Sequence, residues 1–294
     1  ATLYIKLNLK RMACGAGFYS LPFYFTIFNK KLIKDLYLIK NIQAFILSYN
    51  QYKTSSIIAS FLTENSIIDA ICYRAKKDSK AFGSDFMSVS KMQISLYQKK
   101  QPNLSILKES SIIKNYNLLE KSIYSSLAVF YIREILLYSA KDFDERYFIL
   151  MEKILNAMEE LEENKNALLK NYLNILLRAF EMKVLHISGI SPQLDSCVLC
   201  SNSKAYFYSI SEGGIICDNC KKTLKDAIEL DKNDINFMRI IKRTSLIDIV
   251  KNKEINNFYS NSISNVRDIM NKSLFNHLNK NFKSLKVLEE VLFN

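Results

Sequence analysis

The feature that most constrains this 294-residue chain is the stretch CVLCSNSKAYFYSISEGGIICDNC at residues 197–220. It holds four of the six cysteines in the chain, arranged as two Cys-x-x-Cys pairs with sixteen residues between them. Six cysteines are too few for a disulfide scaffold, so we interpret the thiols as reduced, as in a cytosolic protein. Because each Cys-x-x-Cys turn presents two sulfurs to one ion, the spacing predicts a tetrahedral zinc site. The predicted ligands are Cys197, Cys200, Cys217 and Cys220.

Other uses of these cysteines fit the spacing less well. A thioredoxin-type redox pair requires one Cys-x-x-Cys between a strand and a helix, not two in tandem. A zinc deaminase requires His-x-Glu and Pro-Cys-x-x-Cys. No proline precedes Cys197 or Cys217, and the chain contains no His-x-Glu. An empty or degenerate site is the third alternative. Since four sulfurs close the coordination shell of zinc, the predicted role of the metal is structural.

Between residues 42 and 112, short apolar runs alternate with polar turns. The runs are rich in β-branched and aromatic residues, which is typical of strands. They occupy residues 43–49, 55–63, 66–74, 87–97 and 104–110. In the fourth run, Met92, Ile94 and Leu96 alternate with mostly polar residues, which predicts one buried and one exposed face. Five short strands predict a small closed barrel, for which the oligonucleotide-binding (OB) fold is the commonest candidate.

After about residue 115 the apolar spacing becomes helical. The run at 166–188 is apolar nearly all round, which predicts a central buried helix that ends at Gly189 and Pro192. Residues 221–230, 234–250 and 264–292 are also predicted to be helical. The sequence therefore predicts an α+β chain. A five-stranded OB-fold barrel at 41–114 is followed by an α-helical domain at 115–294, into which the zinc knuckle at 195–222 is inserted.

Residues 1–40 precede the predicted barrel and combine basic residues with an apolar stretch that Pro22 interrupts. A positive start before an apolar run resembles a secretory signal. The run is short for a membrane span, however, and it lacks the usual small-residue cleavage site. We interpret the segment as a leader that is either extraneous to the folded protein or a weakly ordered extension. A signal or membrane anchor is the alternative.

The net charge of +12 is concentrated in the first 120 residues, which hold 17 Lys and Arg against 7 Asp and Glu. One connection of the predicted barrel, YRAKKDSKAFGSDF, interleaves cations with aromatic rings. Single-stranded nucleic acid binding requires this combination, cations for the phosphates and rings for base stacking. A merely solvated lysine-rich loop is the alternative. The predicted DNA-binding residues are Arg74, Lys76, Lys77, Lys80, Tyr73 and Phe82.

The sequence contains no catalytic motif that we recognise. It has neither a phosphate-binding Gly-rich loop with lysine nor a Gly-x-Ser-x-Gly nucleophile elbow. Its two histidines, His186 and His277, both lie in predicted helices, where an ordinary helix-surface position is expected. Cys72 lies in a predicted strand and is interpreted as a small buried hydrophobe. We therefore expect a protein that is not an enzyme.

The first cysteine pair follows a Gly-x-x-Pro-x-Leu motif that is formed by Gly189, Pro192 and Leu194. This region resembles the RecO family of recombination mediators, which has the same motif before its first cysteine pair. A Gly-Gly precedes the second pair in YFYSISEGGIICDNC, and HLNKNFKSLKVL resembles the family's closing helix. The predicted strands with their basic loop resemble its OB domain. The resemblance covers residues 41–294; each motif is loose alone, but four in this order are specific.

This resemblance implies a DNA repair factor of the cytoplasm and nucleoid, without a membrane association. Such proteins bind single- and double-stranded DNA and anneal complementary strands. With RecR they help to load RecA onto strands coated by single-strand binding protein, whose C-terminal tail binds the mediator. Composition and motifs by themselves do not predict RecA loading. The alternative from another class is a zinc-stapled adaptor that binds only proteins.

Overall fold

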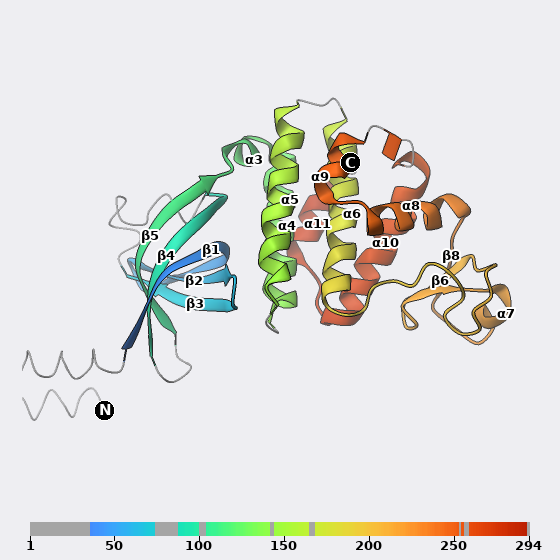
Figure 1. The fold of residues 1–294 in the computed structure, drawn as a ribbon, viewed down its shortest axis with the longest axis horizontal. Helices are drawn as coiled ribbons and strands as arrows, with labels where there is room; N and C mark the ends of the chain where they lie inside the picture. The colour runs from blue at the N-terminus through green and yellow to red at the C-terminus, as the bar shows by residue number, and fades with distance from the viewer. Residues whose placement is uncertain are drawn as a thin grey trace, which may run out of the picture.

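The computed structural model describes residues 36–73, 88–99, 104–141, 144–164, 168–252, 254–255 and 259–292. The first five strands form a closed barrel in the order β1-β2-β3-β5-β4, at the left of Figure 1. These strands are β1 (Leu36–Tyr52), β2 (Ser56–Thr63), β3 (Ile67–Cys72), β4 (Ser90–Lys99) and β5 (Ser105–Asn115). The predicted five-stranded barrel is thus confirmed.

Strand β1 closes the barrel because it pairs with two other strands. Its first part pairs with β4 from Leu36 to Phe45, and its second part pairs with β2 from Ala44 to Tyr52. Irregularities after Ile39 and Ile46 interrupt these ladders, and such bulges bend a strand. Strand β4 continues to Lys99, and Leu36 pairs with this residue, so β1 begins at Leu36. Residues 36–40 of the predicted leader therefore belong to the barrel, and residues 1–35 lie outside the described residues.

The helices that follow the barrel form a bundle with α6 at its centre. They are α3 (Asn117–Lys121), α4 (Ile123–Ser139), α5 (Arg146–Glu163), α6 (Leu169–Ile187), α8 (Lys232–Arg243), α9 (Leu246–Lys251), α10 (Tyr259–Leu278) and α11 (Lys283–Leu292). Helix α6 contacts α4, α5, α8, α9 and α10, and nearly all its side chains from 172 to 185 are buried. It is the central buried helix that the sequence predicts. Among the helices within the described ranges, none has the length and apolar character that a membrane span requires.

Helix α6 ends where its sequence predicts. Gly189 adopts a left-handed conformation with φ of 80°, which glycine permits at no steric cost. Its N–H donates to the carbonyl of His186, and the N–H of Ile190 donates to that of Leu185. These bonds satisfy carbonyls of the last helical turn, as in common C-terminal caps.

Three helical predictions are wrong in part. The predicted helix at 264–292 is interrupted at residues 279–282, between α10 and α11, where Asn279 has a φ of 47°. Residues 221–230 do not form a helix; the short helix α7 (Asp218–Lys221) ends there, and β8 (Ala227–Glu229) follows. The carboxylate of Asp226 accepts hydrogen bonds from the Ser209 hydroxyl and the Ser211 N–H, which holds this segment against another strand. The predicted helix at 234–250 is divided into α8 and α9, because Ser245 caps a new helix by accepting from the N–H of Asp248.

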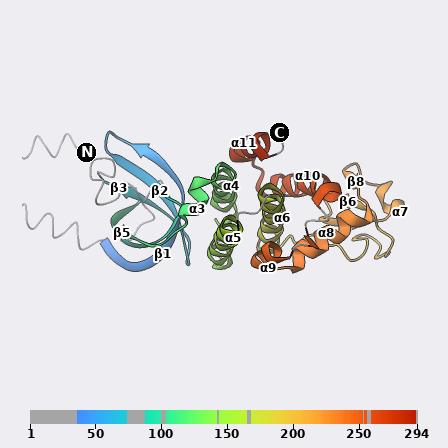
Figure 2. The same cartoon turned by 90° about the horizontal axis from the view of Figure 1, so that it is seen from above.

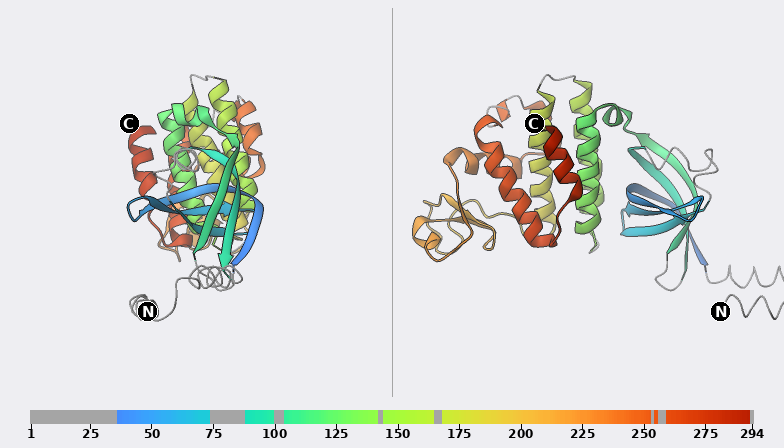
Figure 3. Two further views of the ribbon diagram at one scale, coloured as in Figure 1. Left: turned by 90° about the vertical axis from the view of Figure 1, so that its left-hand side faces the viewer. Right: turned by 180° about the vertical axis from the view of Figure 1, so that it is seen from behind.

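One hydrophobic core joins the helices to one side of the barrel, and the barrel interior has a second core of its own, which includes Phe61 and Met92. Phe45 and Leu62 of the barrel pack into the helical core, and the rings of Phe45 and Phe148 have centroids 5.1 Å apart. Polar contacts surround this junction: Arg133 of α4 donates to the carbonyl of Ser88, and the N–H of Val89 donates to Glu120. Figures 2 and 3 show the barrel beside α4 and α5, with α11 lying against α4.

Candidate metal centre and nucleic-acid interface

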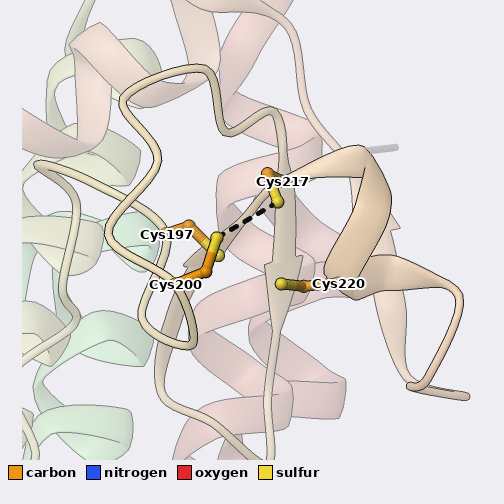
Figure 4. A group of neighbouring side chains, drawn as sticks. All are labelled: Cys197, Cys200, Cys217 and Cys220. Atoms are coloured by element: carbon orange, nitrogen blue, oxygen red, sulfur yellow. Dashed lines mark hydrogen bonds between the residues drawn. The ribbon is translucent and has the colours of Figure 1, made fainter.

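The four cysteines predicted to bind metal lie together at the end of the molecule remote from the barrel (Figures 1 and 4). Their sulfur atoms all lie within 4.8 Å of one another, and the Sγ atoms of Cys200 and Cys217 are 3.6 Å apart. Tetrahedral zinc with Zn–S bonds of about 2.3 Å requires sulfurs roughly 3.8 Å apart. The four thiols could therefore hold one metal ion with small adjustments.

A small three-stranded sheet positions the two cysteine turns. Its order is β7-β6-β8, with β6 at Phe207–Ser209 and β7 at Gly214–Ile216. Cys217 follows β7 directly and is the N-cap of α7, which carries Cys220. The other turn closes when the N–H of Ser201 donates to the carbonyl of Cys197. Each pair thus lies in a tight backbone turn, and the sheet brings the pairs together.

The Gly-Gly sequence before the second pair has a steric role. A Cβ atom at Gly214 would lie 2.6 Å from both the carbonyl oxygen of Gln193 and Cγ1 of Val198. The segment that leads to the first cysteine pair runs parallel to β7 at this point, and Gln193 forms a β-bridge with Gly214. Gly213 has φ of 68°, a conformation that favours glycine. The two glycines therefore allow the cysteine turns to approach each other.

The environment of the thiols favours thiolates at part of the site. Burial acts to raise the pKa of Cys197, but the backbone N–H groups of Cys217, Leu199 and Cys200 outweigh it and lower that pKa to about 6. Hydrogen bonds with the thiols of Cys200 and Cys217 raise the pKa of Cys220 to about 12. Metal binding requires all four ligands as thiolates, so an ion would displace the remaining protons. Four sulfurs would leave the metal no open coordination position.

The cysteine-rich segment is anchored to the helices. Arg239 donates to the carbonyl of Leu194 with Nε at 3.0 Å, and Lys242 donates to that of Pro192 at 2.7 Å. Tyr208 and Ile216 extend the helical core into the small sheet.

Cys72 does not belong to the four-cysteine cluster. It lies in the barrel core, where burial raises its pKa to about 12, as expected for an inert buried thiol.

Most of the predicted DNA-binding residues fall outside the part of the chain that the structure describes. These are Arg74, Lys76, Lys77, Lys80 and Phe82. Tyr73 is described: it follows the end of β3 and is 52% exposed. An exposed ring at the edge of this connection is compatible with base stacking.

Several described cations of the barrel are already paired. The Nζ atom of Lys91 lies 2.8 Å from Oε1 of Glu152, and that of Lys114 lies 2.7 Å from Oε2 of Glu159. Both carboxylates belong to α5, so these lysines join the barrel to the helices. Lys53, in the turn between β1 and β2, has no ion-pair partner among the described residues and lies over the ring of Tyr52. Local sequence patterns do not single out Tyr52 and Lys53, because the position of Tyr52 beside β2 follows from strand pairing.

Comparison with known proteins agrees with the motif resemblance. The family described as "Recombination protein O C terminal" matches residues 121–286. The DNA repair protein RecO of Syntrophus aciditrophicus is 25% identical over 258 residues, which are 85% of this chain and 95% of that protein. The DNA repair protein RecO of Desulfatibacillum aliphaticivorans is 25% identical over 257 residues, 84% of this chain and 95% of that protein. That of Alkaliphilus metalliredigens is 29% identical over 153 residues, half of this chain and 56% of that protein.

Proposed function

The chain belongs to the RecO family, which assigns it a role in DNA repair and recombination, and on this premise we propose that it is a DNA-binding recombination mediator. The observation that carries the proposal is the five-stranded closed barrel on the half of the chain that holds most of the net positive charge. The barrel binds single- and double-stranded DNA, and the protein anneals complementary strands without catalysing a chemical step.

The mechanism that we propose is electrostatic. Arg74, Lys76, Lys77 and Lys80 contact phosphates, while Tyr73 and Phe82 stack on bases. Cations that neutralise phosphates on two strands lower the repulsion between them, so complementary segments can approach and pair. The contacts of the cations are with the phosphate backbone of the DNA, so they do not depend on the base sequence.

The metal in this proposal is a structural zinc ion bound by the four cysteines of the knuckle. Zinc is favoured because four thiolates in a tetrahedral arrangement are its common structural ligand set. The ion would fix the two cysteine turns relative to each other. The helical domain and the knuckle then present surfaces to RecR and to the C-terminal tail of single-strand binding protein, through which RecA is loaded.

The test of DNA binding removes the four basic side chains of the loop by the substitutions R74A, K76A, K77A and K80A. If about four phosphates are neutralised, the log affinity for single strands falls with log salt at a slope near −2.8. Raising salt from about 50 to about 200 mM then weakens binding by roughly fifty-fold. The quadruple variant should have a flatter slope, weaker binding to every sequence and slower annealing.

A matched control removes four exposed lysines from the other half of the molecule. They are Lys204, Lys222, Lys225 and Lys232. This control has the same net charge as the loop variant and should retain the wild-type slope. If both variants lose the same affinity, overall charge is responsible and the loop is not the DNA site. If the wild type anneals no DNA, with or without single-strand binding protein, the protein-only adaptor is favoured instead.

A further inference from the structure

Two tyrosines lie in one row across the outer edge of the barrel. Tyr52, near the end of β1, is directly opposite Ser56 of β2. On the other side of β2, Ile57 is opposite Cys72, the last residue of β3. Continuing this register by one residue places Tyr73, in the turn that follows, level with Ser56. Residues opposite one another project from the same face of a sheet. With strands about 4.8 Å apart, the backbones of the two tyrosines are separated by about 10 Å.

The burial of the residue between them agrees with this register. Ser56 lies next to an exposed turn, yet it is only 6% exposed. Tyr52 and Tyr73 are themselves 36% and 52% exposed. Neither belongs to a hydrophobic core cluster, whereas Tyr116, Tyr131 and Tyr208 are almost completely buried. The two tyrosine side chains therefore lie at the surface, on either side of a buried serine.

A cation accompanies this row. Lys53 has a φ of 54°, and its Nζ lies 5.3 Å from the centroid of the Tyr52 ring. The side-chain amide of Gln51 donates to the carbonyl of Lys53, which supports the turn. The exposed carboxylate closest along these strands, Asp69, accepts a hydrogen bond from Ser60. A positive charge beside exposed aromatic rings fits a ligand that has both planar apolar surfaces and negative charges.

Scattered tyrosines on a sheet surface are common and require no ligand. Two tyrosines in one row, with a lysine over one of them, are a more specific arrangement. We infer that Tyr52 and Tyr73 form a stacking platform for unpaired bases, with Lys53 at the adjoining phosphate, and that this row makes the barrel prefer single-stranded over double-stranded nucleic acid. The inference rests on the proposed DNA binding and assigns residues that determine its selectivity. Bases in a duplex are already paired and stacked, so they cannot occupy the platform.

The first test compares Y52L and Y73L with the wild type on an oligothymidine single strand and on a duplex. One base stacked on an aromatic ring is worth about 1 kcal/mol or more, so each substitution should weaken single-strand binding by at least about fivefold. Binding to the duplex should not change. Tyr49 provides the matched control because it lies on the same strand, is 40% exposed and, three residues from Tyr52, projects from the other face. The substitution Y49L should leave both affinities unchanged.

A second test does not depend on these losses. The chain contains no tryptophan, so Y52W creates a single fluorescent reporter. Its emission should be quenched by an oligothymidine strand and much less by a strand of abasic sites with the same phosphates. The corresponding reporter Y49W should respond to neither. Equal responses of the Tyr52 reporter to the two strands would overturn the platform.

These outcomes separate the inference from the proposed function. If the wild type binds single strands and both leucine variants bind them equally well, the platform and the stacking role of Tyr73 are wrong, while the proposed binding of phosphates by the basic loop stands. If the wild type binds neither single strands nor duplex, both are overturned. A uniform loss for duplex and single strand in the leucine variants would mean that the tyrosines support the barrel rather than read unpaired bases.

Discussion

The ion pair between Arg178 and Glu181 in the central helix α6 provides the most quantitative test of the fold. The guanidinium and the carboxylate are 2.7 Å apart, and both side chains are almost completely buried. Tyr131 of α4 donates to the same carboxylate at 2.6 Å, and Asn271 of α10 accepts from Arg178 at 3.3 Å. The pair therefore joins three helices. We predict that removing either charge alone destabilises the protein more than removing both charges together.

The expected losses follow from these partners. Removing one member of a buried ion pair costs about 3–5 kcal/mol of unfolding free energy. E181Q keeps an acceptor oxygen for Tyr131, so we expect about 3 kcal/mol, the lower end of that range. R178M leaves a buried carboxyl that can take up a proton. The double variant R178M/E181Q leaves no buried charge at this position and should lose only about 1 kcal/mol.

The cost of R178M should depend on pH. Burial raises the pKa of Glu181 to about 7, although Arg178 acts to lower it. Without Arg178 the folded pKa lies higher still, while the unfolded value stays near that of a free carboxyl. When a carboxyl has a higher pKa in the folded state, stability falls as pH rises from the unfolded to the folded value. The variant should therefore lose less stability at about pH 6 than at about pH 8.

The assay is urea unfolding followed by far-ultraviolet circular dichroism, for the wild type, both single variants and the double variant. The coupling energy is the amount by which the two single losses exceed the double loss. We expect it to exceed about 2 kcal/mol. Additive losses, or an R178M cost that is the same at both pH values, would refute the reasoning. Equal slopes of free energy against urea are required before the four proteins are compared.

Two further predictions concern the knuckle. Wild-type protein purified without chelators should contain one zinc ion per chain by elemental analysis. The variant C217S should lose the zinc, unfold at a lower temperature and still bind DNA. Wild-type protein without zinc would contradict this prediction. The added methyl of G214A would lie 2.6 Å from the backbone of Gln193, so this variant should retain less metal and be cleaved faster by protease within 195–229. G213A is the matched control, since its Cβ meets nothing within 4 Å and only its φ of 68° is unfavourable. If G213A is affected more than G214A, the close approach of the two cysteine turns is not the reason for the Gly-Gly sequence.

Local sequence patterns were sufficient for the elements whose signals repeat along the chain. The two Cys-x-x-Cys pairs predicted a four-sulfur cluster because each pair closes within one turn, and the sulfurs do gather within 4.8 Å. The apolar run of α6 predicted a buried helix because it offers no polar face, and Gly189 fixed its end through a conformation that favours glycine. The barrel strands could be predicted because runs rich in β-branched residues lie between polar turns.

Residues far apart in the sequence decided the rest. Leu36 entered the barrel because β4 extends to Lys99, and the stretch at 227–229 became a strand because β6 offered a free edge. Lys91 and Lys114 are equivalent to other lysines in the sequence, but α5 places carboxylates against them and removes them from the free positive charge of the barrel. Tyr52 and Tyr73 are separated by twenty residues and come close to one row only through the registers of three strands. Strand pairing and ion pairing depend on which segments meet in space, and a local pattern of apolar and polar residues does not carry that information.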